Sequence, residues 1–492
     1  MKKNQFQLIF IISIFAITNQ LSAQSVGYCW LNQAGGSNRD AGHGISLFGS
    51  SDILITGKLD QNVFINNYNS TSKLNWSMVF GNASSKSAGN DVATSDSRIF
   101  MVGSFQDTVA FGSFSLVSNS NSDDIFIVRL DGSGNVIWAT RAGGSLEDIG
   151  TGIAVGNFGS DVFVTGWFRD LATFGKGEAN QTELTSAGNK DIFVAKYDGN
   201  TGELVWAKRA GGPQSDNGQG ITLDEFGNSF VTGQFDETRA TFGPGENNET
   251  ALTSRGDKDI FIAKYDPDGL LIWVKQAGGK GKDQGHGIAR YIHEDDEEFG
   301  KTHLYVTGGF NDTGIFDNKS LISSGDRDVF VARYDDDGNL IWIQQAGSIG
   351  RDESRGIHVF RRRDPLGPQA VSVLITGDYV ESMVFAKGLQ NEHKFESNGG
   401  RDIFIAKYNQ SGRLLWAKHS GSVEDDFGSA VTAAAFSYQD ILGEENNLLN
   451  TFVTGSFRST ADFGTFQPTS SGDLDIFVTR IEDLGLPRNL TL

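Results

Sequence analysis

Seven polar residues occupy equivalent positions of a repeated pattern, and their side chains are the best candidates for binding a ligand. Each lies two residues before an Ile or Val that opens a strand-like stretch: His43, Asn90, Thr151, Gln219, His286, Arg355 and Ser429. The residues around them repeat, whereas these seven differ. Two are histidines, a residue type that titrates near neutral pH. We expect the set to rim a central channel as a ligand surface, although a solvent-filled channel mouth would also be polar without a ligand.

A carboxylate recurs five residues before the same Ile or Val in six of the seven copies. These residues are Asp40, Asp148, Asp216, Asp283, Asp352 and Asp426, with Ser87 in the remaining copy. Six carboxylates near a channel could indicate calcium binding or acid–base catalysis. An identical residue in nearly every copy is better explained as a turn cap that accepts backbone N–H groups.

The sequence predicts no metal ligand, no catalytic residue and no cofactor. The loops 174–180 and 242–249 offer oxygen ligands, but they lack the spaced Asp residues of a calcium loop, which leaves calcium as the weaker alternative. No nucleophile elbow, zinc cluster, phosphate loop or dinucleotide fingerprint is present. An enzymatic site remains an alternative, because hydrolases and lyases can assemble their sites from segments far apart in the chain, which no linear motif reveals.

The elements that position these residues are repeated short strands. A Trp marks each of seven units, at Trp30, Trp76, Trp138, Trp206, Trp273, Trp342 and Trp416. Each unit holds four β-branched and aromatic stretches bounded by Gly, Asp and Asn, which is the pattern of strands. The third stretch, as in Ile260–Ala263, is apolar throughout, which indicates a strand covered on both faces. The sequence therefore predicts an all-β, seven-bladed β-propeller of four-stranded antiparallel blades.

The repeated motifs resemble a known family. Asp259–Asp266 reads Asp-Ile-Phe-Ile-Ala-Lys-Tyr-Asp, and a Gly-Asn turn, a Trp and a Gln-Ala-Gly-Gly stretch follow in related copies. These elements are similar to the SBBP (bacterial β-propeller) repeat family, over essentially the whole mature chain. The resemblance implies the propeller fold and an exported protein of Bacteroidetes type, and it implies no particular reaction.

The two ends of the chain predict export and closure of the ring. Lys2 and Lys3 precede the apolar run 8–17, and Ala23 offers a cleavage point. We therefore expect residues 1–23 to be a signal peptide and residues 24–492 to form one propeller domain. The mature chain begins with a lone Trp strand (26–36) and ends with a third strand (475–482), so pairing of the N-terminal strand with the C-terminal blade would close the ring.

The last three units carry longer connections between their first and second strands. This interval is 10 to 12 residues in the first four units and 19 to 23 in the last three. The insertions are acidic (Glu294, Asp295), basic (Arg361, Arg362) and partly apolar (Tyr438). We expect them to be partner-binding loops, since loops on a rigid scaffold commonly carry function. The alternative is that the insertions have no function, because lengthening a surface loop costs little conformational entropy.

Charge narrows the classes of partner. The chain has 41 Lys and Arg against 61 Asp and Glu, a formal net charge of −20, which argues against nucleic acid or an anionic membrane surface. No later stretch is apolar enough to span a membrane. The sequence as a whole predicts an exported, monomeric binding or scaffold module, periplasmic, at the outer surface or secreted, with a protein or glycan partner. The alternative is a carbohydrate-active hydrolase or lyase with its site at the channel mouth.

Overall fold

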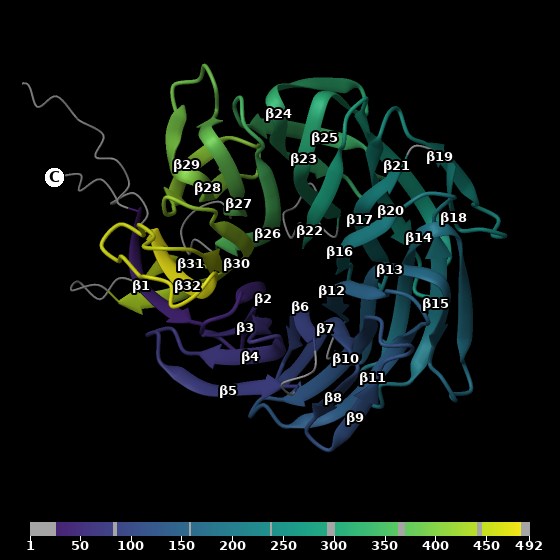
Figure 1. The fold of residues 1–492 in the computed structure, drawn as a ribbon. Coiled ribbons are helices and arrows are strands. Elements are labelled where there is room, and N and C mark those ends of the chain that lie inside the picture. Colours follow the sequence, from purple (N-terminus) through teal and green to yellow (C-terminus); the bar gives the residue numbers. More distant parts are fainter. Residues whose placement is uncertain are drawn as a thin grey trace, which may run out of the picture.

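The computed structural model describes residues 26–81, 86–156, 159–236, 239–292, 301–362, 370–439 and 445–483. The expected signal peptide lies outside these residues. The described chain is built of β-strands, and in each repeated unit the first strand pairs with the second, the second with the third and the third with the fourth, always antiparallel. Figure 1 shows these units arranged around a common centre.

The strands are numbered along the chain. Unit one contains β2 (Ala41–Phe48), β3 (Asp52–Leu59), β4 (Asn62–Tyr68) and β5 (Leu74–Phe80). Unit two contains β6 (Lys86–Ser95), β7 (Arg98–Gln106), β8 (Thr108–Phe111), β9 (Phe114–Val117), β10 (Asp124–Asp131) and β11 (Val136–Gly144). Unit three contains β12 (Ile149–Val155), β13 (Asp161–Phe174), β14 (Thr182–Asp198) and β15 (Leu204–Ala210). Unit four contains β16 (Asn217–Leu223), β17 (Ser229–Asp236), β18 (Arg239–Phe242), β19 (Thr250–Thr253), β20 (Lys258–Tyr265) and β21 (Leu271–Gly279).

The remaining units include the N-terminal strand. Unit five contains β22 (Gln284–Ile292), β23 (Thr302–Phe316), β24 (Lys319–Tyr334) and β25 (Leu340–Ala346). Unit six contains β26 (Glu353–Arg362), β27 (Ala370–Phe385), β28 (His393–Asn409) and β29 (Leu414–Ser420). Unit seven contains β30 (Phe427–Gln439), β31 (Glu445–Phe457), β32 (Asp475–Asp483) and β1 (Val26–Ala34). β1 pairs antiparallel with β32, although the two strands lie at opposite ends of the chain.

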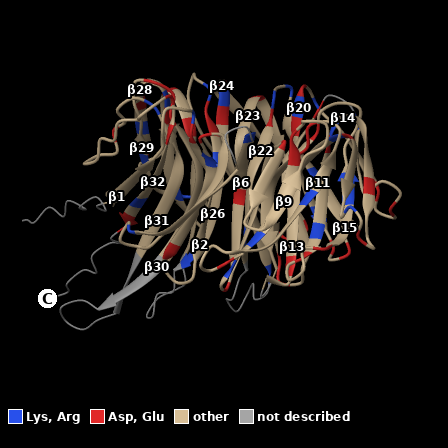
Figure 2. Cartoon of the chain, turned by 60° about the horizontal axis from the view of Figure 1, so that its bottom comes forward, with Lys and Arg blue, Asp and Glu red and all other residues tan. Residues whose placement is uncertain are grey.

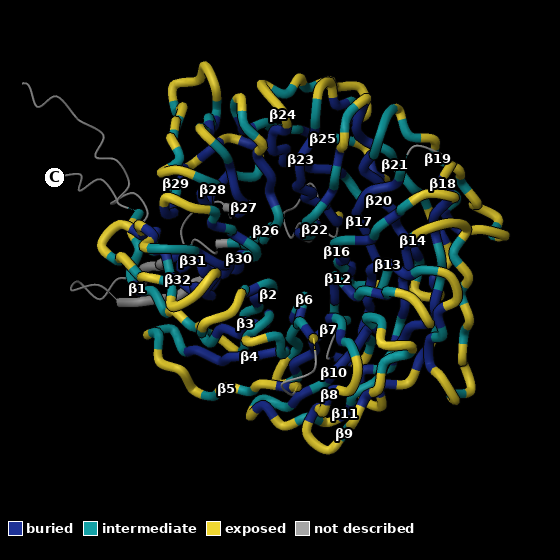
Figure 3. Tube along the Cα trace, in the orientation of Figure 1, coloured by how far each residue is buried: buried dark blue, intermediate teal, exposed yellow. Residues whose placement is uncertain are grey.

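The core lies between neighbouring units. In β20, Ile260, Phe261 and Ile262 are all buried, as expected for a strand covered on both faces. Each apolar cluster draws side chains from two adjacent units; one joins Val102 of unit two to Phe193 of unit three. Another joins Ile53 of unit one to Phe452 of unit seven. Figure 3 shows the buried residues inside the strand layers and the exposed residues mainly at loops and outer edges.

Each repeated Trp links one unit to the next. Its indole Nε1 donates a hydrogen bond to the neighbouring unit. In six cases the acceptor is a carbonyl in the turn after the third strand, and in the seventh it is the carboxylate of Asp483 at the end of β32. The pairs are Trp30 with Ser70, Trp76 with Gly132, Trp138 with Gly199, Trp206 with Pro267, Trp273 with Asp336, Trp342 with Gln410 and Trp416 with Asp483. A buried indole needs an acceptor for its N–H, which explains why Trp recurs at this position.

The connections gather on two loop faces. Figure 2 shows the strands running between these faces, with acidic and basic residues on both. On one face the turns that join third and fourth strands are closed by an Asp side chain, or by an Asn side chain in units one and six (Asn69 and Asn409). In unit four the Asp266 carboxylate accepts the N–H groups of Asp268 and Leu270, and Gly269 adopts a φ of +79°. A polar cap followed by a Gly at positive φ is common in such hairpin turns, because Asp and Asn bond the turn backbone and Gly adopts positive φ without strain.

Candidate functional site

The seven variable polar residues share one structural position, a β-bulge in the innermost strand. In unit one, Gly42 pairs with Gly57 and Gly44 with Thr56, so His43 between them has no partner on β3. The same shift occurs at Asn90, Thr151, Gln219, His286, Arg355 and Ser429. A bulge leaves one residue unpaired and re-aims its side chain. Sevenfold repetition of the bulge thus presents one freely varied side chain per unit.

All seven bulge residues line a single cavity of about 840 Å³. The cavity lies among the innermost strands β2, β6, β12, β16, β22, β26 and β30, which surround the central opening in Figure 1. Its volume is within the range of small-molecule sites. The structure therefore brings together the residues that the sequence singled out, whereas their binding of a ligand stays a prediction.

Three of the bulge residues also lie within hydrogen-bond distance of a backbone carbonyl of the next unit. The Asn90 side-chain amide donates to the Gly150 carbonyl at 2.8 Å, and the Thr151 hydroxyl donates to the Gly218 carbonyl at 2.9 Å. His43 Nδ1 lies 3.0 Å from the Gly89 carbonyl oxygen. Because a carbonyl can only accept, Nδ1 carries the proton and, in the neutral ring, Nε2 keeps its lone pair. These side chains have a structural role in addition to facing the cavity.

Arg355 is held by two buried carboxylates. Its Nε donates to Asp378 at 2.9 Å, and its Nη2 lies 3.5 Å from Glu353. The charge of Asp378 is the main cause that raises the pKa of this guanidinium, and Glu353 adds to it, whereas burial lowers it. Asp378 is also paired with Arg401 at 2.7 Å. The Arg355 side chain is therefore fixed in place at the edge of the cavity.

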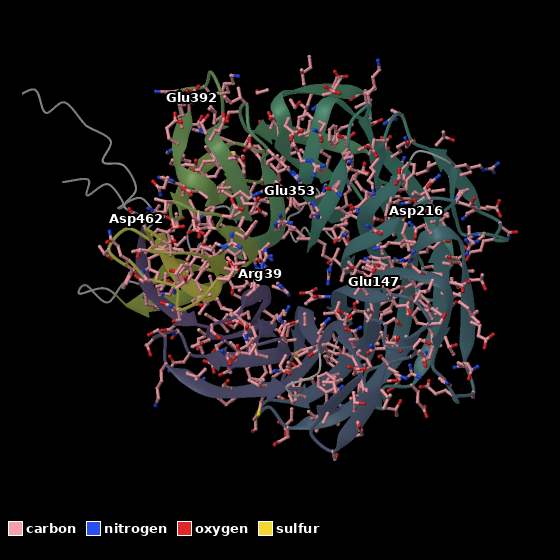
Figure 4. All side chains as sticks on the ribbon, in the orientation of Figure 1. Arg39, Glu147, Asp216, Glu353, Glu392 and Asp462 are labelled. Carbon is pink, nitrogen blue, oxygen red and sulfur yellow. The ribbon has the colours of Figure 1, made fainter. Side chains whose placement is uncertain are left out.

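Glu353 is the centre of an ionic network between units five and six. Its carboxylate is 2% exposed and contacts His286 Nε2 at 2.8 Å, Arg327 at 2.7 Å and Arg351 at 3.2 Å. Burial alone would raise the pKa of Glu353, but the charges of His286, Arg355 and Arg327 outweigh it and hold the pKa well below its usual range. Glu353 therefore remains ionised and holds His286 and Arg355 in position. Figure 4 labels it close to the central opening.

Asp91 also lines the cavity, although it is not one of the residues that the sequence predicts there. It follows the bulge residue of unit two, at a position where the other units have Gly44, Gly152, Gly220, Gly287, Gly356 and Ala430. It accepts N–H groups from Ile153 at 3.0 Å and Val92 at 2.8 Å. Burial raises the pKa of Asp91 to about 6 in spite of these two bonds. Comparing the units at this position would have revealed it.

Two cations also line the cavity, Arg39 just before the first inner strand and Lys58 near the end of β3. Burial is the main cause that lowers the pKa of His43, and the charges of Lys58 and Arg355 lower it further, against a hydrogen bond to Gly89 that raises it. Lys58 and Arg355 are therefore within electrostatic range of the same imidazole. Figure 4 shows Arg39 at the edge of the central opening.

The repeated aspartates that precede the inner strands cap backbone groups. Asp216 accepts the N–H of Gly212 at 2.6 Å and that of Asp236 at 2.9 Å, and each of the other five carboxylates also accepts two backbone N–H groups. The turn-cap interpretation is thus confirmed. Within the described ranges, no group of three or more His, Cys, Asp or Glu side chains is arranged to hold a metal ion.

The structure places the insertion residues only in part. Glu294 and Asp295 lie outside the described residues. Arg361 and Arg362 do not lie in a loop as predicted, since they pair with Val371 and Ala370 in a longer β26–β27 ladder. Tyr438 likewise lies on β30, opposite Asn446. The extra length is therefore taken up partly by strand extension, which satisfies the backbone groups of the inserted residues.

No helix within the described part of the chain has the length and apolar character needed to cross a bilayer.

Comparison with known proteins gives one family match and distant relatives. Residues 205–234 match the SBBP beta-propeller repeat model. The chain is 24% identical over 247 residues to an uncharacterised WD repeat-containing protein of Acanthamoeba polyphaga mimivirus, covering 44% of this chain and 17% of that protein. It is 24% identical over 196 residues to the regulatory protein FlaEY of Caulobacter vibrioides, covering 39% of this chain and 19% of that protein. The matched region thus spans less than a fifth of each relative.

Solved structures with a similar fold include a europium-containing methanol dehydrogenase, at a TM-score of 0.40 and 10% identity over 92% of this chain and 93% of that one. They also include the polysaccharide lyase Uly1, at a TM-score of 0.35 and 11% identity over 95% of this chain and 94% of that one. Together with the all-β architecture, the match at residues 205–234 supports an SBBP-type β-propeller repeat in this chain.

Proposed function

We propose that this chain is a seven-bladed β-propeller with a closed ring. Three observations support closure between units seven and one. β1 pairs with β32, Trp30 of β1 donates to Ser70 of unit one at 3.1 Å, and one apolar cluster joins the two units. Closure of this kind leaves few free strand edges.

On that scaffold, the chain is a binding module whose ligand occupies the central cavity. The observation that carries this function is the contrast between a repeated frame and unrepeated bulge residues. Glycine flanks most of the bulges, while the bulge residues that face the shared cavity all differ except for two histidines. A rigid scaffold that presents varied polar side chains in a concave site is the usual form of a ligand pocket.

The N-terminal sequence supports an exported protein, acting in the periplasm, at the outer surface or after secretion, and as a monomer. Residues 1–23 have the charged and apolar regions of a signal peptide. The insertions that contain Glu294, Asp295 and Tyr438 are a second set of segments to which a protein partner would bind.

Thermal shift with a panel of glycans and small metabolites tests the binding function, because a ligand of the native state raises its apparent stability. Gln219→Trp and Ser429→Trp fill the cavity, and neither residue has a side-chain hydrogen bond to another described residue, so the fold should survive. Ser133→Trp, on an exposed hairpin turn, is the matched control. The proposal expects a ligand that stabilises the wild type and Ser133→Trp but neither cavity variant. Equal stabilisation of all four proteins would place the site elsewhere.

A carbohydrate-active reaction in the same cavity is the second candidate. The observation that favours it is that two ionisable side chains line the same cavity, His43 and Asp91. Asp91 has a pKa of about 6, and its backbone lies against Gly44, the residue after His43. A group titrating near the working pH suits general acid–base catalysis. Release of reducing ends or of unsaturated products from a glycan, lost in Asp91→Asn and His43→Gln, would establish it. Binding without turnover by the wild type would leave the binding module.

A further inference from the structure

The cavity is positively charged although the chain is strongly acidic. The formal net charge of the chain is −20. Among the described lining residues, the two histidines aside, three cations (Arg39, Lys58 and Arg355) face one carboxylate, that of Asp91. A concave site with low-dielectric walls focuses such a field and attracts ligands of the opposite sign.

The side chains of Arg39 and Lys58 are not held by a short contact within the described structure. No ion pair or side-chain hydrogen bond joins either of them to another described residue. The acid next to Arg39 in sequence, Asp40, uses its two oxygens to accept the N–H groups of Gly36 at 2.8 Å and of Asp60 at 2.7 Å. Both cations are thus available to a ligand.

The third cation, Arg355, is prepared for binding by its network. The Nε of Arg355 donates a hydrogen bond to Asp378, and its Nη2 lies near Glu353. Its Nη1 has no hydrogen-bond partner among the described residues. The network does not neutralise the site, because its two carboxylates face four guanidinium groups, those of Arg327, Arg351, Arg355 and Arg401. A guanidinium that is already fixed loses less conformational entropy when it pairs with an oxyanion.

The cations come from different units and act on one region. Lys58 belongs to unit one and Arg355 to unit six, and both lower the pKa of His43, whose first cause of lowering is burial. Separate positive centres around one cavity fit a ligand with more than one anionic group. Uncharged groups lie between them, since the side chains of Gln219 and Ser429 face the same cavity with no hydrogen bond to another described residue. Such groups suit hydroxyls.

We infer that the cavity binds an acidic oligosaccharide, whose carboxylate or sulfate groups pair with Arg355, Lys58 and Arg39 and whose hydroxyls bond Gln219 and Ser429. This inference rests on the proposed binding function and names its ligand class. Charge-assisted hydrogen bonds to Arg and Lys supply the affinity, and the fixed fork of Arg355 supplies orientation.

Isothermal titration calorimetry on the purified full chain tests the inference with four probes: trigalacturonate, its neutral counterpart maltotriose, the non-sugar polyacid citrate and inorganic sulfate. We expect trigalacturonate to bind and the other three to bind at least about ten-fold more weakly, as expected for the loss of one charge-assisted contact or more. Lys58→Gln and Arg39→Gln should each weaken trigalacturonate binding about ten-fold, and Lys58→Arg should retain it. Lys176→Gln, on an exposed hairpin turn outside the cavity lining, is the matched control.

The outcomes separate this inference from the proposed function. Tight binding of maltotriose that Ser429→Trp abolishes would overturn the acidic ligand and keep the cavity as a binding site. Citrate or sulfate binding as tightly as trigalacturonate would overturn the sugar. Trigalacturonate binding that Ser429→Trp and Lys58→Gln leave intact, or no binding of any probe, would contradict the inference outright.

Discussion

At the scale of single residues, the structure separates side chains that hold the scaffold from those that face the cavity. Asp216 and its equivalents accept backbone N–H groups and recur for that reason. Gln219 and Ser429 make no such contacts among the described residues and occupy bulges that line the cavity. Variation between units thus has a structural meaning, because a bulge residue is free of ladder pairing.

Removing the buried carboxylate of Glu353 should destabilise the protein. In Glu353→Gln, the 4% exposed Arg327 loses its charge partner, and breaking a buried pair in this way costs about 3–5 kcal/mol. Chemical denaturation measures the loss. The control is Glu396→Gln, which removes one partner of an exposed pair with Lys394 and should leave the transition unchanged. An equal, small effect of the two substitutions would contradict a stabilising role for the network.

The affinity for an acidic oligosaccharide should rise as the pH falls. Asp91, with a pKa of about 6, is ionised at pH about 7.5 and repels an anionic ligand; it is protonated at pH about 5, and the repulsion is lost. Calorimetry at the two pH values measures the change. Asp91→Asn should bind more tightly at the higher pH and show a flatter profile. His43 also titrates in the cavity, so His43→Gln serves as the second variant that separates the two contributions.

The sequence predicts the seven bulge residues because they occupy one register position, but it does not reveal the full charge of the cavity. Asp91 lies one position after the bulge residue, where five of the other six units have Gly and the sixth has Ala. Arg39 and Lys58 come from a connecting loop and from a second strand. That they line the same cavity as Arg355 depends on how units one and six are placed around the centre. A local sequence pattern does not give this placement.

At the scale of elements, the repeated motifs of the sequence correspond to links between neighbouring units. The Trp of each outer strand donates to the next unit, and the Gly of the adjoining turn packs against a Trp ring, as Gly269 does against Trp206. The strand order and hairpin turns are therefore readable from the sequence. The insertions are not, because loop and extended ladder have the same length, and only the pairing of Arg362 with Ala370 distinguishes them.

Loss of one indole N–H should have a modest, local cost. Trp273→Phe keeps an aromatic ring but removes the 3.1 Å bond from Nε1 to the Asp336 carbonyl. We expect a loss of about 1 kcal/mol for the hydrogen bond, in addition to the smaller ring, measured by urea denaturation. Phe226→Tyr, at a 71% exposed aromatic position, is the control for a surface change. A neutral Trp273→Phe would show that packing alone accounts for the recurrent Trp.

At the scale of the whole molecule, buried carboxyls between units should make stability depend on pH. The pKa is raised to about 7 for Asp148, Asp216 and Asp402 and to about 8 for Asp352. Burial is the largest cause and a neighbouring carboxylate adds to it, whereas hydrogen bonds from backbone N–H groups lower the pKa in part. The unfolded chain releases these protons near pH 4, so the folded state binds more protons above that pH. Stability is therefore expected to fall as the pH rises from about 4 and to level off above about 8, once these carboxyls are ionised in the folded state as well.

Thermal unfolding across this pH range checks the slope. Asp352→Asn should flatten it, whereas Asp268→Asn, on an exposed turn, should leave it as in the wild type. A melting temperature that rises with pH through the same window would show that these carboxyls are ionised in the folded protein.

Closure of the ring can be tested by removing the strand that would complete it. Deleting residues 24–36 removes β1 with Trp30 and leaves the edge of β32 unpaired. An exposed edge strand promotes association, so we expect aggregation or a loss of cooperative unfolding. Light scattering and calorimetry provide the readout. A monomeric, cooperatively folded deletion variant would contradict the closed ring.

The central claim is that the bulge residues of the inner strands form one ligand site. A crystal structure of the protein with saturating trigalacturonate tests it most directly. We expect the sugar in the central cavity, with a carboxylate on Arg355 and hydroxyls near Gln219 or Ser429. A saccharide bound on the outer strands or on the insertions, with the central cavity holding only solvent, would contradict it.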